Sequence, residues 1–587
     1  MKNWRIVEVK DGKDKETNGN IEDFFGYLKD FIRDNDYIKV FEELKYSDIL
    51  LKSETEKLQV QDFLNRELLK IDDKNFIENK KRTEKFFDEI KLLNDLYYEM
   101  VKLKKERISG DEFIVSNMCN YINNLLENEK NLDVFEECVI VLSTFLKDMM
   151  INRELTFKYS EEVSKKEEEI EKVFKIYQDL YRFGYLTDIW KFGDLKILDD
   201  YFEEEGEIGK NKIISQILYF EKKETKVHAV NSIESFLISQ IKEYFHSSNL
   251  EDIYKKIPLK NWLKVYLILY YLVIEKYYLA IENKNSIKIQ RYKEDELLDL
   301  LSKYEKRYDC ILKENIEKIE DEDTKLLVST LRSVNLSKDD IEEILEHFIF
   351  SKNSKDLYDS PIIEFKENGS TYNIILPQIF LRTDHSRALI SILSSDNKSE
   401  IDQKGTNLEK YIYSLMNNSK IHYKPNVRKT LNDESYELDM MFCIDKELII
   451  VEIKTHNQPE KYYDFYRSME KFEEDIEKFN RNIKYFINNQ KEYIEENVGE
   501  YNRYKKIFLS DITYNMSDFE DIIIIDKEDF EKTLSNLKNK NNYIDKLLDF
   551  RKEKIDELNL QVSKDLIRFT RKYKGFIGYK AYSIKNN

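Results

Sequence analysis

The feature that most constrains this chain is the uneven distribution of its helix-breaking residues. Glycine is absent between Gly209 and Gly369, and Pro258 is the only proline before residue 350. The other four prolines all lie beyond residue 350. Glycine and proline are the residues that most disfavour helix, so a long stretch without them that is rich in Leu, Lys, Glu and Ile favours helix.

Apolar residues in the same part of the chain recur at three- and four-residue steps, the period of one helix face. This spacing predicts that residues 1–350 form a large acidic α-helical region, with room for more than one subdomain. No repeat of fixed period supports a solenoid. Two examples of the spacing are Phe24, Tyr27, Leu28 and Phe31, and Ile341, Ile344, Leu345 and Phe348.

Composition excludes several classes of protein. Hydrophobic residues make up 41% of the 587 residues and charged residues 36%, which allows buried cores and excludes a wholly disordered chain. With 13 glycines and 5 prolines, collagen-like and sandwich-type all-β folds are disfavoured. The formal charge of −19 offers no global attraction for nucleic acid, but residues 401–587 contain 33 basic and 34 acidic residues, so the acidity belongs to the first 400.

The four cysteines form no CxxC pair, which disfavours a disulfide framework or a zinc ribbon and favours a reducing compartment. The first residues lack the apolar core of a signal peptide. The most apolar segment, 265–274, is too short to span a bilayer and is typical of a buried helix. We therefore expect a cytoplasmic protein with no membrane partner.

The pattern of apolar residues changes from helical periodicity to strand-like alternation near residue 351. Apolar and polar residues alternate on either side of Glu367-Asn368-Gly369, which predicts a β-hairpin. Residues 387–393 are expected to form a short helix capped by Asp384 or Ser386. We interpret 351–400 as a connecting segment that ends in a polar linker.

Residues 401–537 are expected to form an α/β domain with a mixed central sheet, because helical and strand patterns alternate and the run of four isoleucines reads as a buried strand. Residues 538–587 are expected to be a helical, basic and aromatic extension. The expected elements of the α/β domain are a helix over 406–416, an extended segment over 421–428, strands over 436–444 and 447–454, a helix over 460–487, apolar runs over 506–509 and 521–525, and a helix over 529–537.

The candidate catalytic and metal-binding residues lie in two predicted strands joined by a tight turn at Asp445-Lys446. Side chains alternate along a strand, so Glu452 and Lys454 share one face and the antiparallel return brings Asp439 towards Glu452. Two close carboxylates repel unless a cation holds them together. A hard divalent ion such as Mg²⁺ fits this donor set, and the lysine could orient or deprotonate a water molecule.

Asp439, a spacer and Glu452-Ile453-Lys454 resemble the motif of the PD-(D/E)xK nuclease superfamily, which has the restriction-endonuclease-like fold. Gly405-Thr406-Asn407-Leu408-Glu409 is similar to the G-x-x-x-E element that opens a helix in the Mrr-like and archaeal resolvase-like branches. The resemblance covers about residues 400–537. Leu438 stands where the motif name has proline, and the glutamine–tyrosine helix motif of RecB-like branches is not matched.

The resemblance implies a role for each matched residue. Asp439 and Glu452 would bind Mg²⁺ or Mn²⁺ together with the backbone carbonyl of Ile453. Lys454 would assist the attacking water, and Glu409 would lie in an outer or second metal shell. An ExK tripeptide alone is weak evidence for a nuclease, because residues 6–10 (IVEVK) are similar to residues 450–454 (IVEIK). The early copy has no preceding strand to supply an aspartate, and we interpret it as an ordinary edge strand.

Other side chains are weaker candidates. Aromatic residues interleave with the basic residues of the C-terminal tail, which suits contact with phosphates and bases, although a final helix with solvated lysines explains the pattern equally well. His456 is expected to face solvent, and Asp384-His385-Ser386 to be a helix cap rather than a catalytic triad. The basic residues predicted to contact nucleic acid are Lys424, Arg428, Lys429, Arg571, Lys572 and Lys574.

The sequence thus predicts a metal-dependent endonuclease that hydrolyses phosphodiester bonds in DNA. A role in prokaryotic defence is expected from what restriction-like domains with large appended regions do. The helical region would serve regulation or assembly, with a second copy of the chain or a defence-system protein as partner. The alternative is a non-catalytic helical scaffold whose C-terminal domain binds nucleic acid or a protein.

Overall fold

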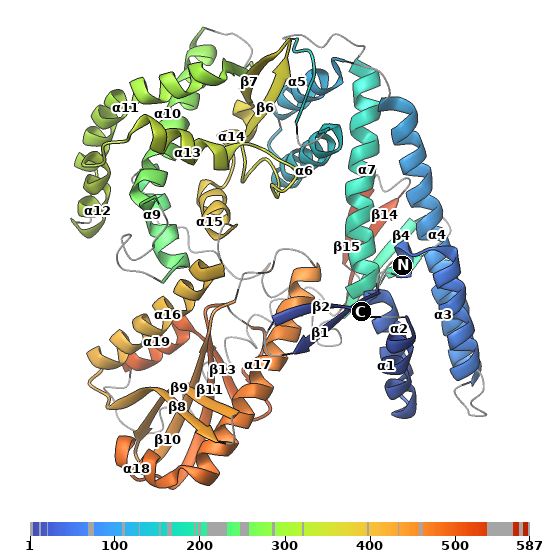
Figure 1. Ribbon diagram of the computed structural model, residues 1–587, viewed down its shortest axis with the longest axis vertical. Helices are drawn as coiled ribbons and strands as arrows, with labels where there is room; N and C mark the ends of the chain where they lie inside the picture. The colour runs from blue at the N-terminus through green and yellow to red at the C-terminus, as the bar shows by residue number, and fades with distance from the viewer. Residues whose placement is uncertain are drawn as a thin grey trace.

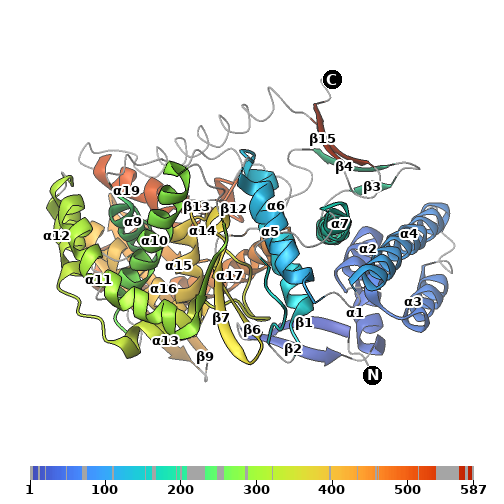
Figure 2. The ribbon, with the colours of Figure 1, turned by 90° about the horizontal axis from the view of Figure 1, so that it is seen from above.

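The structure is a computed structural model of the whole chain, drawn in Figures 1 and 2. A large helical region and a C-terminal α/β domain are both present, as the sequence predicts. The residues that the structure describes are 4–10, 13–19, 21–47, 49–68, 76–108, 112–127, 129–151, 154–160, 167–192, 195–197, 201–207, 232–246, 257–283, 288–319, 322–395, 398–431, 434–456, 459, 462–512, 514–536, 568–574 and 579–584.

The first part of the helical region has two hydrophobic cores. One joins the helices from α1 to α4 with α7, and the other lies between α5, α6 and α7. A capping box starts α3, where Ser53 and Glu56 satisfy each other's backbone N–H groups. The elements are β1 (Trp4–Lys10), β2 (Lys13–Gly19), α1 (Ile21–Arg33), α2 (Tyr37–Tyr46), the 3₁₀ helix η1 (Ile49–Leu51), α3 (Glu54–Glu67), α4 (Phe76–Ile108), α5 (Ile114–Glu127), α6 (Leu132–Met149) and α7 (Glu167–Phe192).

The second part of the helical region is built around α10, which contains the apolar segment predicted to be a buried helix. Lys264 of α10 is a fully buried cation that lies 3.0 Å from Glu305 and 3.0 Å from Asp309, and it donates to the carbonyl of Val334 at 2.7 Å. In the part of the chain that the structure describes, no helix is long and apolar enough to cross a bilayer. The elements are β3 (Leu195–Ile197), β4 (Tyr201–Glu207), α9 (Ile233–Tyr244), α10 (Leu259–Glu282), β5 (Gln290–Lys293), α11 (Glu294–Glu317), α12 (Glu322–Arg332) and α13 (Lys338–Phe348).

The predicted hairpin and short helix after residue 351 are present as β6 (Ile362–Glu367), β7 (Ser370–Ile375) and α15 (His385–Ser395), with α14 (Pro377–Phe380) between them. Asp384 is the cap, since its carboxylate accepts the backbone N–H groups of Ser386 and Arg387. Residues in this segment also pack into the helical region rather than only connecting it to the C-terminal domain. β7 also pairs with β5, and the hairpin's buried residues belong to the cores of the helical region.

The C-terminal domain is a six-stranded mixed sheet in the order β12-β13-β11-β10-β9-β8, with β10, β11 and β13 parallel. Helices α17 and α18 cover one face, and α16 and α19 cover the other. The elements are α16 (Lys398–Asn418), β8 (Tyr423–Leu431), β9 (Glu434–Ile444), β10 (Glu447–Lys454), α17 (Tyr462–Asn489), α18 (Lys491–Val498), β11 (Arg503–Ser510), β12 (Asp518–Phe519), β13 (Ile522–Asp526) and α19 (Lys527–Asn536).

The helical region contacts this domain at the start of α17 and around α9 and α15. Aromatic residues at the start of α17, Tyr462 and Phe465, are buried in the core formed by α1–α4 and α7. Helix α9 packs on α15, and α15 contacts α16, so α9 and α15 lie between α10 and the domain (Figure 1). Seen from above, α3 and α4 lie at one end of the molecule and α11 and α12 at the other (Figure 2).

The structure corrects the prediction of a helical C-terminal extension for residues 568–574 and 579–584, whereas residues 538–567 lie outside the described residues. Within residues 538–587, the described segments are two antiparallel strands, β14 (Arg568–Lys574) and β15 (Tyr579–Ile584), and β14 also pairs with β4. The interleaving of basic and aromatic residues is compatible with the two-residue period of a strand as well as with a helix, so the pattern alone did not decide between them. Helix α16 also begins at Lys398, so Gly405 lies inside it and does not open it.

Candidate active site

The candidate site lies where the sheet opens around Asp439. The register between β9 and β10 runs from Ile444–Glu447 to Met440–Val451, and the next pair would be Asp439 and Glu452. On the other side of β9, the residue opposite Asp439 is Asn426, which has a left-handed φ of 49°. The Asp439 carboxylate replaces a backbone hydrogen bond between β9 and β10 beyond the last paired residues, because its Oδ2 accepts the N–H of Ile453 at 2.7 Å. An apolar residue could not do this.

Alternation along β10 places the motif residues as the sequence predicts. Ile453 belongs to the core under α16, whereas Leu448 and Ile450, which share the parity of Glu452 and Lys454, belong to the core under α17. The Nζ atom of Lys454 lies 2.5 Å from Glu452 Oε1 and 3.6 Å from Asp439 Oδ2. The three side chains therefore converge on the α17 face.

Burial differs among these three side chains. Glu452 is 4% exposed and Asp439 11%, whereas Lys454 is 26% exposed. Glu452 Oε2 is buried, and no described residue donates a hydrogen bond to it. A buried carboxylate oxygen without a partner is costly, so this atom is available to a further ligand.

The electrostatics follow from this packing. Burial raises the pKa of Glu452, the ammonium of Lys454 opposes the rise, and the charge of Asp439 adds to it. Burial by itself would lower the pKa of Lys454, but Glu452 and Asp439 outweigh it and raise that pKa. Lys454 is thus held as a cation, which suits orientation of a water molecule better than removal of its proton.

Glu409 reaches the same place from α16. Its pKa is raised by burial first and by the charge of Asp439 second, and the ammonium of Lys454 opposes the rise. Tyr413, one turn further along α16, donates to the backbone carbonyl of Asp439 at 3.0 Å and to Glu409 at 3.4 Å. Glu409 is therefore tied to the Asp439 strand without touching the Glu452–Lys454 pair, a position compatible with an outer role.

His456 does not face solvent, contrary to the prediction. Its side chain is 9% exposed, and Nε2 lies 3.2 Å from Asp475 Oδ2 of α17. On its other side, Nδ1 lies 3.1 Å from the Tyr514 hydroxyl and 3.5 Å from Ser510 Oγ. Ser510 is fully buried, so this serine, histidine and aspartate cannot form a hydrolytic triad with an accessible nucleophile.

Asp475 belongs to the electrostatic surroundings of the candidate site. Its charge raises the pKa values of both Glu452 and Lys454. Sequence reasoning missed Asp475 because it sits in a helix with many acidic residues, and only the fold shows which of them faces β10. The histidine two residues beyond Lys454 was the available signal.

Asp511, the residue after β11, is a second group that sequence reasoning missed. It is 4% exposed, and Oδ1 accepts the N–H of His456 at 2.8 Å while Oδ2 lies 2.6 Å from the Nζ of Lys404. Burial alone would raise its pKa, but the neighbouring His246 imidazole and the charge of Lys404 outweigh burial and lower the pKa to about 2. Asp511 is therefore a firmly ionised anchor next to the end of β10.

The donor set fits a divalent cation. Among the described residues, no three His, Cys, Asp or Glu side chains gather into a ready metal cage. The unpartnered Glu452 Oε2 and the neighbouring Asp439 carboxylate instead offer two acidic donors. Mg²⁺ is bound in this way by one or two carboxylates, with the remaining ligands supplied by water and substrate phosphate.

The predicted nucleic-acid contacts fall into two groups. Lys424, Arg428 and Lys429 lie on the edge strand β8, which passes beside Asp439. Arg428 is paired with Glu437 at 2.7 Å, and the Nζ of Lys429 lies 4.0 Å above the ring of Tyr493. The strand β8 therefore lies beside the site, but these contacts do not test whether it binds nucleic acid, which stays a prediction.

The second group lies on β14, for which the structure gives the backbone register only. Arg571 stands opposite Glu204, Lys572 opposite Glu203, and Lys574 opposite Tyr201 of β4. Opposite charges at paired positions of neighbouring strands favour strand pairing. The pairing with β4 is thus an alternative explanation for the basic residues of β14.

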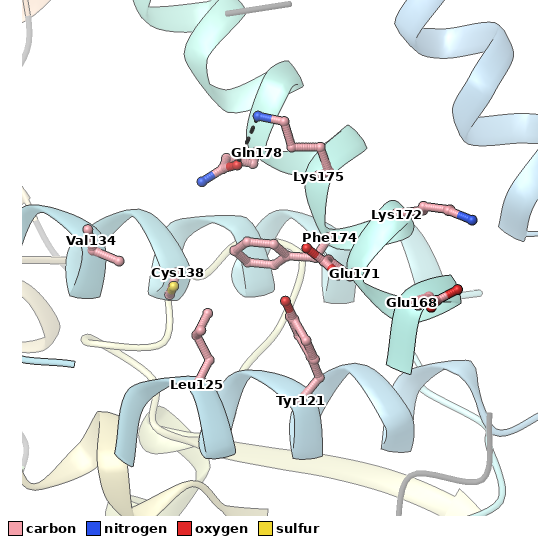
Figure 3. Close-up of a pocket in the computed structure, with 10 residues that line it drawn as sticks. All are labelled: Tyr121, Leu125, Val134, Cys138, Glu168, Glu171, Lys172, Phe174, Lys175 and Gln178. Carbon is pink, nitrogen blue, oxygen red and sulfur yellow. Dashed lines mark hydrogen bonds between the residues drawn. The ribbon is translucent and has the colours of Figure 1, made fainter. Parts of the chain in front are cut away.

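A pocket of about 450 Å³ lies elsewhere, between α5, α6 and α7 of the helical region (Figure 3). Its floor is apolar and includes Leu125 and Phe174, and its rim carries both signs of charge, as in Glu171 and Lys172. None of its lining residues comes from the C-terminal domain, so it is not part of the carboxylate–lysine site.

Comparison of the chain with protein-family models, curated proteins and solved structures found no match. The interpretation of the site therefore depends on its own geometry.

Proposed function

We propose that this protein is a metal-dependent nuclease that hydrolyses phosphodiester bonds in DNA at Asp439, Glu452 and Lys454. The observation that carries the proposal is the convergence of the three side chains at the opening of the sheet, with one buried oxygen of Glu452 unpartnered.

Each residue has a distinct part in the proposed chemistry. Asp439, Glu452 and the Ile453 carbonyl would hold Mg²⁺ or Mn²⁺, with Glu409 in an outer position. When bound, the cation would supply Lewis-acid stabilisation of charge on the phosphate. Lys454, a cation beside both carboxylates, would orient the attacking water and contact a phosphate oxygen.

The arrangement of elements supports assigning the domain to the PD-(D/E)xK superfamily. A helix with Glu409, three antiparallel strands that carry the motif, a crossover helix and a parallel strand follow in the expected order. The crossover from β10 through α17 to β11 makes the sheet mixed. A cytoplasmic role in prokaryotic defence belongs to the same proposal and rests on the sequence resemblance.

A cleavage assay with matched variants tests the proposal. Supercoiled plasmid, single-stranded DNA and single-stranded RNA are incubated with the full chain and Mg²⁺ or Mn²⁺. Asp439→Asn and Lys454→Met should abolish cleavage of DNA. The chain supplies its own control in the similar segment of β1, where Glu8→Gln should leave the rate unchanged. Equal cleavage by wild type and Asp439→Asn would refute the proposal.

The alternative, a non-catalytic domain that binds a partner, is favoured by one observation. Lys454 already neutralises both carboxylates, as in a closed structural ion pair. Calorimetry with Mn²⁺ separates the two functions without requiring a substrate. A nuclease site should bind Mn²⁺ and lose it in Asp439→Asn, whereas a closed ion pair should bind none in either protein.

A further inference from the structure

We propose that the helical region regulates the carboxylate–lysine site through a direct contact between His246, at the end of α9, and Asp511. The inference rests on the proposed function, because it names the regulation of that same site. An intact contact would keep the end of β10 in its active position, and any ligand or partner that displaces α9 would lower the rate of cleavage.

The first step of the argument is that Asp511 fixes the end of β10. Its backbone N–H donates to the carbonyl of Lys454 at 3.3 Å. Its Oδ1 accepts the backbone N–H of His456 at 2.8 Å. Asp511 therefore holds the main chain on both sides of Thr455, and with it the strand end from which the Lys454 side chain extends.

The second step is that Asp511 is held in turn from two regions of the protein. Within the α/β domain, Lys404 of α16 lies 2.6 Å from Oδ2 and also donates to the carbonyl of His456 at 3.0 Å. From the helical region, Nε2 of His246 lies 3.5 Å from the same Oδ2. The side chains of His246 and Asp511 are 5% and 4% exposed, so water screens their interaction little.

The third step is that the position of His246 depends on the helical region. Helix α9 has Leu237, Ile238 and Ile241 in the core around α10, and it packs on α12 and α15. His246 itself has a φ of 51°, the left-handed conformation that turns the chain sharply after the helix. A rigid movement of α9 would therefore carry the imidazole away from Asp511.

The geometry also assigns the orientation of the imidazole. Nδ1 of His246 lies 3.4 Å from the Nζ of Lys527, an ammonium that can only donate. Nδ1 is then the acceptor and Nε2 carries the hydrogen; Nε2 lies 3.5 Å from Asp511 Oδ2 without meeting hydrogen-bond geometry, so the contact is an electrostatic one. A neutral histidine thus bridges a lysine of α19 and the aspartate that follows β11.

The test compares His246→Gly with wild type in the full chain. Glycine accepts the positive φ of this position, so the imidazole is lost without added backbone strain. The matched control is Glu243→Ala, which changes an exposed residue on the last turn of the same helix. A second variant, His246→Asn, also tolerates the left-handed conformation but is too short to keep the contact.

The first readout is hydrogen exchange of the backbone amides of His456 and Asp511, which needs no activity. We expect about tenfold faster exchange in both His246 variants, the effect of losing the imidazole that packs against the buried Asp511 carboxylate, and no change in Glu243→Ala. Equal exchange in His246→Gly and wild type would overturn the inference. A melting temperature within the range of the control shows that the variants are folded.

The second readout is cleavage of DNA. The inference expects the maximal rate to fall about tenfold in His246→Gly, while the DNA concentration for half-maximal rate stays unchanged. An unchanged maximal rate in an active enzyme would overturn the regulatory role even if exchange increases. A wild type that cleaves nothing but shows the exchange difference would instead refute the proposed function and keep the coupling.

Discussion

Replacement of Lys454 by methionine should convert the candidate site into one whose stability depends on a divalent cation. Met fills a similar volume but removes the ammonium that lies 2.5 Å from Glu452 and 3.6 Å from Asp439. At an effective dielectric constant of about 20, these two contacts correspond to gross attractions of roughly 7 and 5 kcal/mol. Most of this attraction offsets the cost of burying the charges.

The net loss should be about 3–5 kcal/mol, as when one partner of a buried ion pair is removed and the other is left unpaired. For a domain of this size the melting temperature would fall by roughly 6–20 °C. Addition of Mg²⁺ or Ca²⁺ should restore much of it, because a divalent cation can hold the two carboxylates in place of the ammonium. Thermal unfolding followed by circular dichroism, with and without metal, measures both effects.

Two controls make this prediction sharp. Lys484→Met, on the exposed side of α17, should leave the melting temperature unchanged with or without metal. The double change of Lys454→Met with Glu452→Gln should recover stability in the absence of metal, because the buried unpaired charge is gone. A single Lys454→Met protein as stable as wild type, with no response to metal, would refute the reasoning.

The remaining predictions concern pH and salt. Asp511, whose pKa is lowered to about 2, contributes about 2 kcal/mol that is present above pH 4 and lost as pH falls towards 2, so Asp511→Asn should flatten the acid limb of an unfolding curve. Burial lowers the pKa of His385 to about 4, so wild type should lose about 3 kcal/mol between pH 6.5 and 4, and His385→Gln should lose less over that range. If β8 contacts DNA, Lys424→Ala should reduce the slope of log affinity against log salt by about one, measured by fluorescence anisotropy. Identical slopes would remove Lys424 from the interface.

The local pattern of the C-terminal domain could be predicted from the sequence because short-range rules determine it. Alternation along β10 put Glu452 and Lys454 on one face, and the turn after Ile444 brought Asp439 opposite Glu452, and the structure has both. The strand bounds 447–454 agree with the structure because the tight turn and the following loop set them.

What the sequence did not reveal depends on long-range packing. Asp511 and His456 are separated by 55 residues and meet only because β10 and β11 are parallel neighbours. His246 reaches Asp511 from a helix more than 250 residues earlier in the chain. No local periodicity encodes such contacts, so His456 read as an exposed loop residue and Asp511 as an ordinary acid.

The C-terminal extension is a case in which the type of element was predicted wrongly. Aromatic residues are interleaved with basic ones from Arg568 to Lys574, a pattern that we interpret from the sequence as a helix with solvated lysines, whereas the structure has a strand there. The strand β14 needs β4 as a partner, a segment about 360 residues earlier in the chain. Pairing with so distant a strand cannot be inferred from the tail alone.

The most direct test of the central claim is a crystal structure of the protein soaked in Mn²⁺ and measured at the manganese absorption edge. The account predicts one anomalous peak within about 2.1 Å of oxygen atoms of both Asp439 and Glu452, with Lys454 Nζ moved away from Glu452 Oε1. If no peak appears at saturating Mn²⁺ and Lys454 still bridges the two carboxylates, the proposed metal-dependent hydrolysis at this site is contradicted.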